Sequence, residues 1–257
     1  MIHQAPDFLR NPNHNINICV IGAGGTGSLI LSRLARLNYA LKQSNRAGLN
    51  VTVYDGDTVE AHNVGRQMFT PQDIGEHKSF ALVSKINRAF LTDFKAVVHH
   101  FEITKGIQHQ NIFITAVDNA QFRIEFDTYF KQLESNNESL RNHHQSYYWM
   151  DFGNSKNNGQ CVLGSNHIEQ NNSSEEFCSK LPTVIDLFPN IEAQDTKEIQ
   201  GTSCSYQSKL NEQSLFINDS LSSIGMHLLY DLLIIGHIEQ HGFFLNLKTY
   251  KLNPLKI

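Results

Sequence analysis

The first 150 residues alternate between short apolar runs and longer stretches in which apolar positions recur at helical spacing. The apolar runs predict buried strands at residues 16–21, 51–54, 96–101, 112–117 and 146–152. The periodic stretches predict helices over residues 28–41, 77–91 and 121–133. Since strands and helices alternate, and a glycine-rich turn joins the first strand to the first helix, this order is typical of a doubly wound, mostly parallel sheet.

The remaining stretches are less regular. Residues 134–145 are polar and predict an exposed connection, and residues 160–163 predict another strand. The segment from about 165 to 205 begins with a run rich in Asn, Ser and Glu, which predicts a mobile crossover. Residues 211–237 form a long amphipathic to apolar stretch and predict one core helix, and residues 242–247 close the apolar pattern.

These elements predict an α/β fold with a Rossmann-like, mostly parallel sheet and additional C-terminal strands and a helix. The length suits one domain over residues 1–257. Within it we expect a nucleotide-binding βαβ part at 1–150 and a C-terminal part at 151–257.

A glycine turn follows the first predicted strand directly. Gly22, Gly24 and Gly27 have the G-x-G-x-x-G spacing, and Gly25 lies between them. Backbone N–H groups in such a turn and at the start of the next helix can hold phosphates. The turn therefore predicts nucleotide binding, although its spacing alone does not say which nucleotide.

Polar side chains follow the second predicted strand. Asp55 ends that strand, where a carboxylate can meet ribose hydroxyls, and Asp57 shares the same rim. Further along come four residues that add amides and positive charge: Asn63, Arg66, Gln67 and Lys78. Nicotinamide hydride transfer does not need so much positive charge beside a ribose carboxylate, whereas stabilising a reacting triphosphate does.

Composition limits the partners, the cellular location and the metal sites that we expect. The net charge of −4 gives no sign of binding to nucleic acid or an anionic membrane. The apolar runs are too short to span a bilayer, and the first residues lack a signal-peptide profile, so we expect a cytoplasmic protein. None of the four cysteines lies in a C-x-x-C pair, so their spacing argues against a four-cysteine zinc site, and we expect free thiols.

The string Asp55-Gly-Asp-Thr-Val-x-x-x-Asn63-x-x-Arg66-Gln67, followed by Lys78, resembles the ThiF/MoeB/ubiquitin-activating adenylyltransferase superfamily. The stretch from Ala116 to Arg123 is similar to that family's aspartate-centred strand end. Further similar positions are Asp151-Phe-Gly-Asn and Gly159-Gln160, so the resemblance covers roughly residues 16–163. C-terminal strings at 181–189, 203–205, 215–218 and 241–247 resemble the PRTRC-system ThiF branch, which is bacterial and encoded beside a small ubiquitin-like protein.

The resemblance implies ATP and Mg²⁺ as cofactors. It implies that Asp55 takes the ribose, that Asn63, Arg66, Gln67 and Lys78 surround the phosphates, and that Asp118 holds Mg²⁺ and faces the reacting α-phosphate. Arg66 and Asp118 are thus the candidate catalytic residues. A C-terminal carboxylate has a pKa near about 3.5, so it is already ionised and needs no general base. The barrier lies in bringing two anions together, which cations and positioning lower.

The resemblance also implies partners. The substrate would be the C-terminal glycine carboxylate of a small ubiquitin-like protein, with a homodimer expected and a conjugating-enzyme-like protein as an open possibility. Cys204 lies in the crossover and is the candidate thioester-forming nucleophile, with Cys178 as a weaker alternative. The family's arginine-rich opening is missing here, and Arg10 is the one nearby candidate for an arginine supplied across the dimer.

Two rival hypotheses from other functional classes remain open at this point. One is a nicotinamide-dependent oxidoreductase, which Arg66, Gln67 and Lys78 disfavour. The other is a nucleotide-binding assembly protein that has lost catalysis, which an intact Asp118 and Arg66 disfavour.

Overall fold

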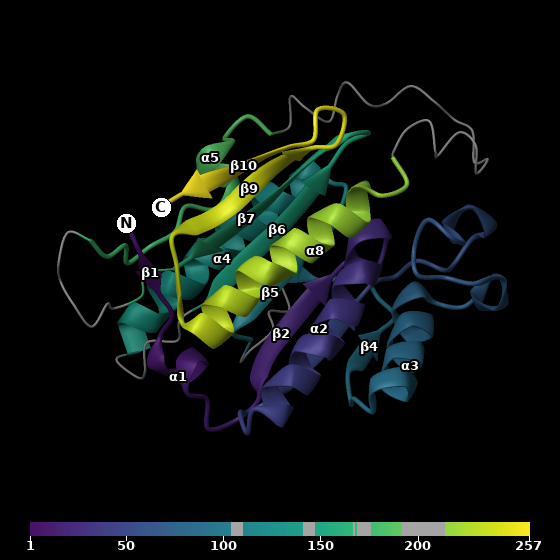
Figure 1. Ribbon diagram of the computed structural model, residues 1–257, viewed down its shortest axis with the longest axis horizontal. Helices are drawn as coiled ribbons and strands as arrows, with labels where there is room; N and C mark the ends of the chain where they lie inside the picture. Colours follow the sequence, from purple (N-terminus) through teal and green to yellow (C-terminus); the bar gives the residue numbers. More distant parts are fainter. Residues whose placement is uncertain (104–109, 141–146, 167, 169–175, 192–213) are drawn as a thin grey trace.

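The computed structural model describes residues 1–103, 110–140, 147–166, 168, 176–191 and 214–257. In this part of the chain the central element is an eight-stranded sheet with the order β10-β9-β7-β6-β5-β2-β3-β4 (Figure 1). Its strands are β2 (Ile16–Ile21), β3 (Leu49–Tyr54), β4 (Lys95–Val97), β5 (Ile112–Thr115), β6 (Tyr148–Asn154), β7 (Asn158–Ser165), β9 (Gln240–Asn246) and β10 (Lys251–Lys256).

The sheet has a parallel and an antiparallel part. Strands β4, β3, β2, β5 and β6 pair in parallel, with Ile21 opposite both Tyr54 and Thr115. Strands β7, β9 and β10 add to the β6 edge in antiparallel register. The α/β class with a mostly parallel Rossmann-like sheet and added C-terminal strands is therefore confirmed.

Helices cover both faces of the sheet (Figure 1). One face carries α2 (Gly25–Gln43), α3 (Lys78–Phe90) and α8 (Ile217–Tyr230), and α8 packs along α2. The other face carries α4 (Ala120–Leu140) and the short α5 (Val184–Leu187). Alternate strand residues point to the two faces because side chains alternate along a strand.

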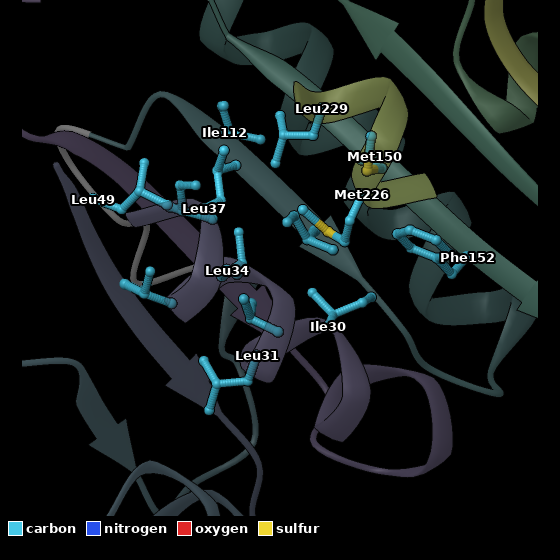
Figure 2. Packing of buried hydrophobic residues seen from close by; sticks show 14 of the residues in the cluster. Ile30, Leu31, Leu34, Leu37, Leu49, Ile112, Met150, Phe152, Met226 and Leu229 are labelled. Carbon is cyan, nitrogen blue, oxygen red and sulfur yellow. The ribbon is translucent and has the colours of Figure 1, made fainter. Parts of the chain in front are cut away.

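The larger apolar core lies under α2 and α8. Ile30, Leu31, Leu34 and Leu37 of α2 meet Met226 and Leu229 of α8, with Ile112, Met150 and Phe152 of the sheet completing the cluster (Figure 2). The opposite core is more aromatic, because Phe126 of α4 contacts Phe113 and Trp149 of the sheet at ring-centroid distances of 5.3 and 5.0 Å. Each face of the parallel strands is thus buried, as a doubly wound fold requires.

Several predicted boundaries were wrong, and the strand predicted over 96–101, for example, ends at Val97. The predicted single helix over 211–237 ends its α-helical part at Tyr230, continues as a π-helical turn η4 (Asp231–Ile235), and gives way to β8 (His237–Ile238). Gly236 adopts φ +87°, a left-handed conformation in which glycine ends helices. The polar stretch predicted as a connection from residue 134 instead continues α4 to Leu140.

The N-terminal segment, for which we predicted no element, is ordered by contacts with distant parts of the chain. It forms β1 (His3–Gln4), which pairs with β8, and α1 (Asp7–Arg10). His3 is fully buried, with Nε2 2.8 Å from the Tyr148 hydroxyl and Nδ1 2.7 Å from the Cys178 carbonyl oxygen. Among the described helices, none combines the length and apolar character needed to cross a membrane.

Candidate active site

A pocket of about 1130 Å³ opens at the carboxyl ends of the parallel strands. The chain proceeds from β2 outward to β3 on one side and later to β5 on the other, so the pocket lies at the switch point where doubly wound sheets bind ligands. Ten of the twelve predicted site residues line it: Gly22, Gly24, Gly25, Asp55, Asp57, Asn63, Arg66, Gln67, Lys78 and Asp118.

The glycine turn needs its glycines for different reasons. Gly22 has φ +94°, and a Cβ there would lie 2.6 Å from the Ala116 carbonyl oxygen. A Cβ on Gly27, which does not line the pocket, would lie 1.9 Å from the Gly22 oxygen. A Cβ on Gly24 would meet nothing within 4 Å, so this residue leaves the turn's backbone open to the pocket. The turn is therefore tightly packed on one side and approachable on the other, as a phosphate-binding turn must be.

Asp55 holds the glycine turn in place. Its Oδ2 accepts a hydrogen bond from the Ala23 backbone N–H at 2.6 Å, and its Oδ1 accepts one from the Asp57 backbone N–H at 2.9 Å. The residue is 8% exposed and lines the pocket. The carboxylate thus links the turn after β2 to the end of β3, next to the space that a ribose would occupy.

Asp57 and Lys78 form an ion pair at the pocket wall. Lys78 is the first residue of α3 and donates from Nζ to Asp57 Oδ2 at 2.8 Å. This hydrogen bond lowers the pKa of Asp57 below its usual value. His100 Nε2 lies 3.9 Å from Asp57 Oδ1 and lines the same pocket. A phosphate would therefore meet a lysine that already has a carboxylate partner.

The connection between β3 and α3 is shaped by local turns. Asn63 ends a 3₁₀ turn, η1 (Ala61–Asn63), and its Oδ1 accepts from the Glu60 backbone N–H at 2.9 Å. Arg66 and Gln67 follow and line the pocket. Gln67 Oε1 is buried and has no hydrogen-bond partner among the described residues. Leaving a buried acceptor unsatisfied is costly, so a ligand that donates a hydrogen bond there would stabilise the site.

Asp118 lies just beyond β5 and is exposed at the pocket. The loop that carries it is held by Arg123, which donates to the Val117 carbonyl oxygen at 2.6 Å and to the Phe152 carbonyl oxygen at 3.0 Å. Arg123 also forms a buried ion pair with Asp151 at 3.0 Å. Arg123 and Asp151 therefore hold the ends of β5 and β6 together. Asp118 remains exposed beside them, as a third carboxylate of the pocket after Asp55 and Asp57.

The predicted cysteine and arginine candidates lie elsewhere. Cys204 falls outside the described residues. Cys178 does not line the pocket, and its Sγ donates to the Lys180 carbonyl oxygen at 2.9 Å. Cys19 and Cys161 are fully buried, and burial raises the pKa of both thiols. Arg10 is in α1, pairs with Asp7 and is absent from the pocket lining.

The described residues contain no cluster of three or more His, Cys, Asp or Glu side chains that could hold a metal by themselves. The exposed carboxylate of Asp118 is nevertheless compatible with Mg²⁺, which binds through one or two carboxylates together with substrate phosphates. The open backbone at Gly24 and the unpaired Gln67 oxygen fit a nucleotide as well.

The far end of the pocket was not predicted as a binding surface, although Asn154 and Gln160 stand in strings that carry the family resemblance. It is lined by uncharged residues of β6, β7, β9 and β10, among them Asn154, Asn158, Gln160, Asn246 and Asn253. These amides come from two segments, 154–160 and 246–253, which become neighbours through strand pairing, since Asn158 is opposite Asn246. No local motif places the residues of 246–253 beside those of 154–160, because this proximity follows from the pairing of β7 with β9.

Comparison with known proteins supports the resemblance of the first half of the chain to the ThiF family. Residues 10–134 match the ThiF family. A stretch of 84 residues, 32% of this chain, is 31% identical to the NEDD8-activating enzyme E1 catalytic subunit of Dictyostelium discoideum, of which it covers 17%.

Solved structures share the fold over most of the chain. A crystal structure of PaaA has a TM-score of 0.60 at 12% identity, with 94% of this chain and 64% of that chain covered. A structure of E. coli MccB with ATP has a TM-score of 0.58 at 11% identity, with 94% and 63% covered. The chain thus spans less than two thirds of these structures and about a sixth of the curated relative. Residues 10–134 thus match the ThiF family, and the chain as a whole shares the fold of these solved structures.

Proposed function

We propose that the protein is an ATP-dependent adenylyltransferase that activates the C-terminal carboxylate of a small ubiquitin-like protein. One observation carries the proposal: a single pocket at the switch point combines an open glycine turn, Arg66, Lys78 and the exposed carboxylate of Asp118. We treat residues 1–257 as one adenylation domain because one sheet runs through its nucleotide-binding and C-terminal parts.

In the proposed reaction a carboxylate oxygen attacks the α-phosphorus of ATP. A new oxygen–phosphorus bond forms, the bond to the bridging oxygen breaks, and pyrophosphate leaves with its electron pair. Mg²⁺, held by Asp118 together with the phosphates, would supply charge stabilisation when bound. No proton has to be removed from the carboxylate, so the site needs positioning groups and cations more than a base.

The chain's own residues would divide this task. The glycine turn and the start of α2 would donate backbone N–H groups to the phosphates, and Asp55 would accept from the ribose. Arg66 and Lys78 would stabilise the negative charge on the departing pyrophosphate. Because Lys78 already pairs with Asp57, the phosphates would compete with that carboxylate for the ammonium group.

Three observations support a protein as the second substrate: the C-terminal sequence strings, the named relatives and the volume of the pocket. The C-terminal strings resemble the PRTRC-system branch, which is encoded beside a small ubiquitin-like protein. The E1 relative is named for activating NEDD8, and another MccB structure is a complex with N-formylated MccA. A pocket of about 1130 Å³ exceeds the usual size for one small ligand, which leaves room for a peptide end beside a nucleotide. A cytoplasmic location, where ATP is available and thiols stay reduced, belongs to the same proposal.

The assay that tests the proposal follows the position of a label in ATP. With Mg²⁺ and the neighbouring ubiquitin-like protein, label in the α-phosphate should move to the protein's C-terminus, and label in the γ-phosphate should leave in pyrophosphate. Transfer of the γ-label to the protein would instead indicate a kinase and overturn the proposal. A parallel titration with NADH tests the oxidoreductase alternative, and ATP binding without any label transfer would favour the inactive assembly protein.

A second step, transfer of the acyl group to Cys204, extends the proposal. The thiolate sulfur would attack the acyl carbonyl carbon and AMP would leave. A reducible conjugate should then appear on a non-reducing gel with Mg-ATP and disappear in Cys204→Ala. A conjugate that survives Cys204→Ala would move the role of nucleophile to Cys178. If the wild type forms no conjugate, the reaction ends at the adenylate, and this cysteine passes nothing to a conjugating-enzyme-like protein.

A homodimer completes the proposal. Within the C-terminal helical segment, Phe216 and Ile235 are 64% and 54% exposed, apolar surface that a second copy could bury. Light scattering at micromolar concentration should give about twice the chain mass of 29.2 kDa. A mass near the single-chain value would contradict this part of the proposal.

A further inference from the structure

Helix α8 reaches the glycine turn through one buried side chain. Asn218, the second residue of α8, is 3% exposed and does not itself line the pocket. Its Oδ1 accepts hydrogen bonds from Thr26 Oγ1 at 2.9 Å and from Asn154 Nδ2 at 2.7 Å. A Cβ on Gly25 would lie 2.4 Å from its Nδ2. Asn218 therefore joins three parts of the fold: the glycine turn with the start of α2, the end of β6, and α8.

This junction also sets the direction of a pocket side chain. Because Asn218 Oδ1 can only accept, Asn154 must turn its NH₂ group toward α8. The Oδ1 of Asn154 is then the atom left for a ligand, and it has no partner among the described residues. A carbonyl oxygen suits an N–H or O–H donor, such as a peptide N–H, and does not suit a phosphate or a carboxylate.

The junction lies where two chemically different ends of the pocket meet. Thr26 belongs to the turn that faces the charged residues, and Asn154 belongs to the uncharged lining, which continues through Asn158 and Asn246 by strand pairing. A shift of Asn218 would therefore change the position of the turn relative to the uncharged end. Misplacement of reacting groups by about 1 Å can lower a rate by roughly a hundredfold.

We propose that Asn218 is a positioning residue that aligns the glycine turn with Asn154, and through them the nucleotide with the peptide end of the second substrate. The inference rests on the proposed adenylation. It assigns Asn154 as a hydrogen-bond acceptor for a main-chain N–H of the carboxylate substrate. Loss of Asn218 disturbs the relative placement of two substrates and leaves each half of the pocket chemically intact.

The test compares Asn218→Ala with Ser220→Ala, a control on the same helix whose hydroxyl only donates to the Phe216 carbonyl oxygen. Calorimetry with Mg-ATP alone should give a dissociation constant within about threefold of wild type for both variants. Pyrophosphate exchange with the neighbouring ubiquitin-like protein should lose about tenfold to a hundredfold in kcat/KM for Asn218→Ala and stay unchanged for Ser220→Ala. A merely structural role would lower the melting temperature without this split between ATP affinity and exchange.

A double-mutant cycle keeps the inference falsifiable if Asn218→Ala folds poorly. Asn154→Ala removes the acceptor itself, so adding Asn218→Ala to it should cost much less than Asn218→Ala costs alone. Thr26→Val, which removes a single hydroxyl donor, should show a smaller loss in the same direction. Fully additive losses, or wild-type exchange in Asn218→Ala, would overturn the positioning role while leaving adenylation in place. Absence of exchange in wild type would overturn both proposals.

Discussion

At one end of the pocket, residues up to Arg123 supply every formally charged group of the described lining, whereas from Phe152 onward the lining is uncharged. The charged end combines two aspartates of the β3 connection, Arg66 and Lys78 with Asp118. The other end presents mainly amide and apolar side chains. The cation that borders the uncharged end, Arg123, is already paired with the buried Asp151. A carboxylate entering along this end is therefore attracted most strongly toward the charged end, where the proposed reaction takes place.

The two ends also differ in how they are built. The charged end comes from short connections after β2, β3 and β5, whose side chains are fixed by neighbours such as the Asp55 contact with Ala23. The uncharged end comes from antiparallel strands that depend on long-range pairing. Substitutions at the charged end should therefore change ATP binding or chemistry, and substitutions at the uncharged end should change use of the second substrate.

The largest expected effect is at Asp118. Asp118→Ala removes the one exposed carboxylate available to Mg²⁺ at the β5 end, so exchange should fall by at least about a thousandfold, since metal stabilisation contributes several kcal/mol. Some nucleotide binding should remain by calorimetry. Asp118→Asn, which keeps the shape of the side chain and loses its charge, should lower the exchange rate almost as much. Exchange near the wild-type rate in either variant would remove the metal role.

Asp55 should have the next largest effect, on ATP affinity. Asp55→Ala removes acceptors for two backbone N–H groups, and a hydrogen bond to a charged group contributes about 1.5–3 kcal/mol, so ATP binding should weaken roughly tenfold to a hundredfold. Asp55→Asn retains one acceptor oxygen and should lose less. Calorimetry on folded protein measures this, and an unchanged affinity in Asp55→Ala would end the ribose assignment.

A charge placed at the uncharged end should have a smaller and more selective effect. Asn158→Asp adds a negative charge beside the proposed path of the carboxylate, so KM for the protein substrate should rise a few-fold by repulsion in a solvent-accessible setting. The dissociation constant for Mg-ATP should stay at the wild-type value. Equal changes in both quantities would show that the two ends do not act separately.

The smallest effect on activity is expected at His3, outside both ends. Burial lowers the pKa of His3 from 6.5 to about 4, with His241 nearby adding to the shift and the Cys178 carbonyl opposing it. The neutral form is favoured in the fold, so stability is complete above pH 6.5 and decreases as pH falls from 6.5 toward 4, by up to about 3 kcal/mol. Urea titrations should show this loss, and His3→Gln should flatten it. A wild-type stability that is constant between pH 7 and 4.5 would contradict the assignment.

Much of the charged end could be predicted because its residues are close in sequence. The turn from Gly22 to Gly27 and the string from Asp55 to Lys78 each follow a strand directly, and parallel strands bring such positions to one edge. The uncharged end could not be predicted in this way. Thr26 and Asn218 are 192 residues apart, and their hydrogen bond follows from the packing of α8 on α2.

Two further features, a proline in β10 and an aspartate in β6, show what the sequence could and could not predict. The strand β10 contains Pro254, which usually argues against a strand, yet it is tolerated because β10 pairs on one side alone as the sheet edge. Asp151 in an otherwise apolar run could have signalled a buried partner, since a buried charge must be paired, but the sequence does not identify that partner as Arg123.

The most direct test of the central claim is ATP–pyrophosphate exchange by the wild-type protein. Labelled pyrophosphate should enter ATP when Mg-ATP and the neighbouring ubiquitin-like protein are both present, and incorporation should stop when that protein lacks its C-terminal glycine. Incorporation that is indifferent to the glycine, or its absence with a folded, ATP-binding enzyme, would contradict adenylation of that carboxylate.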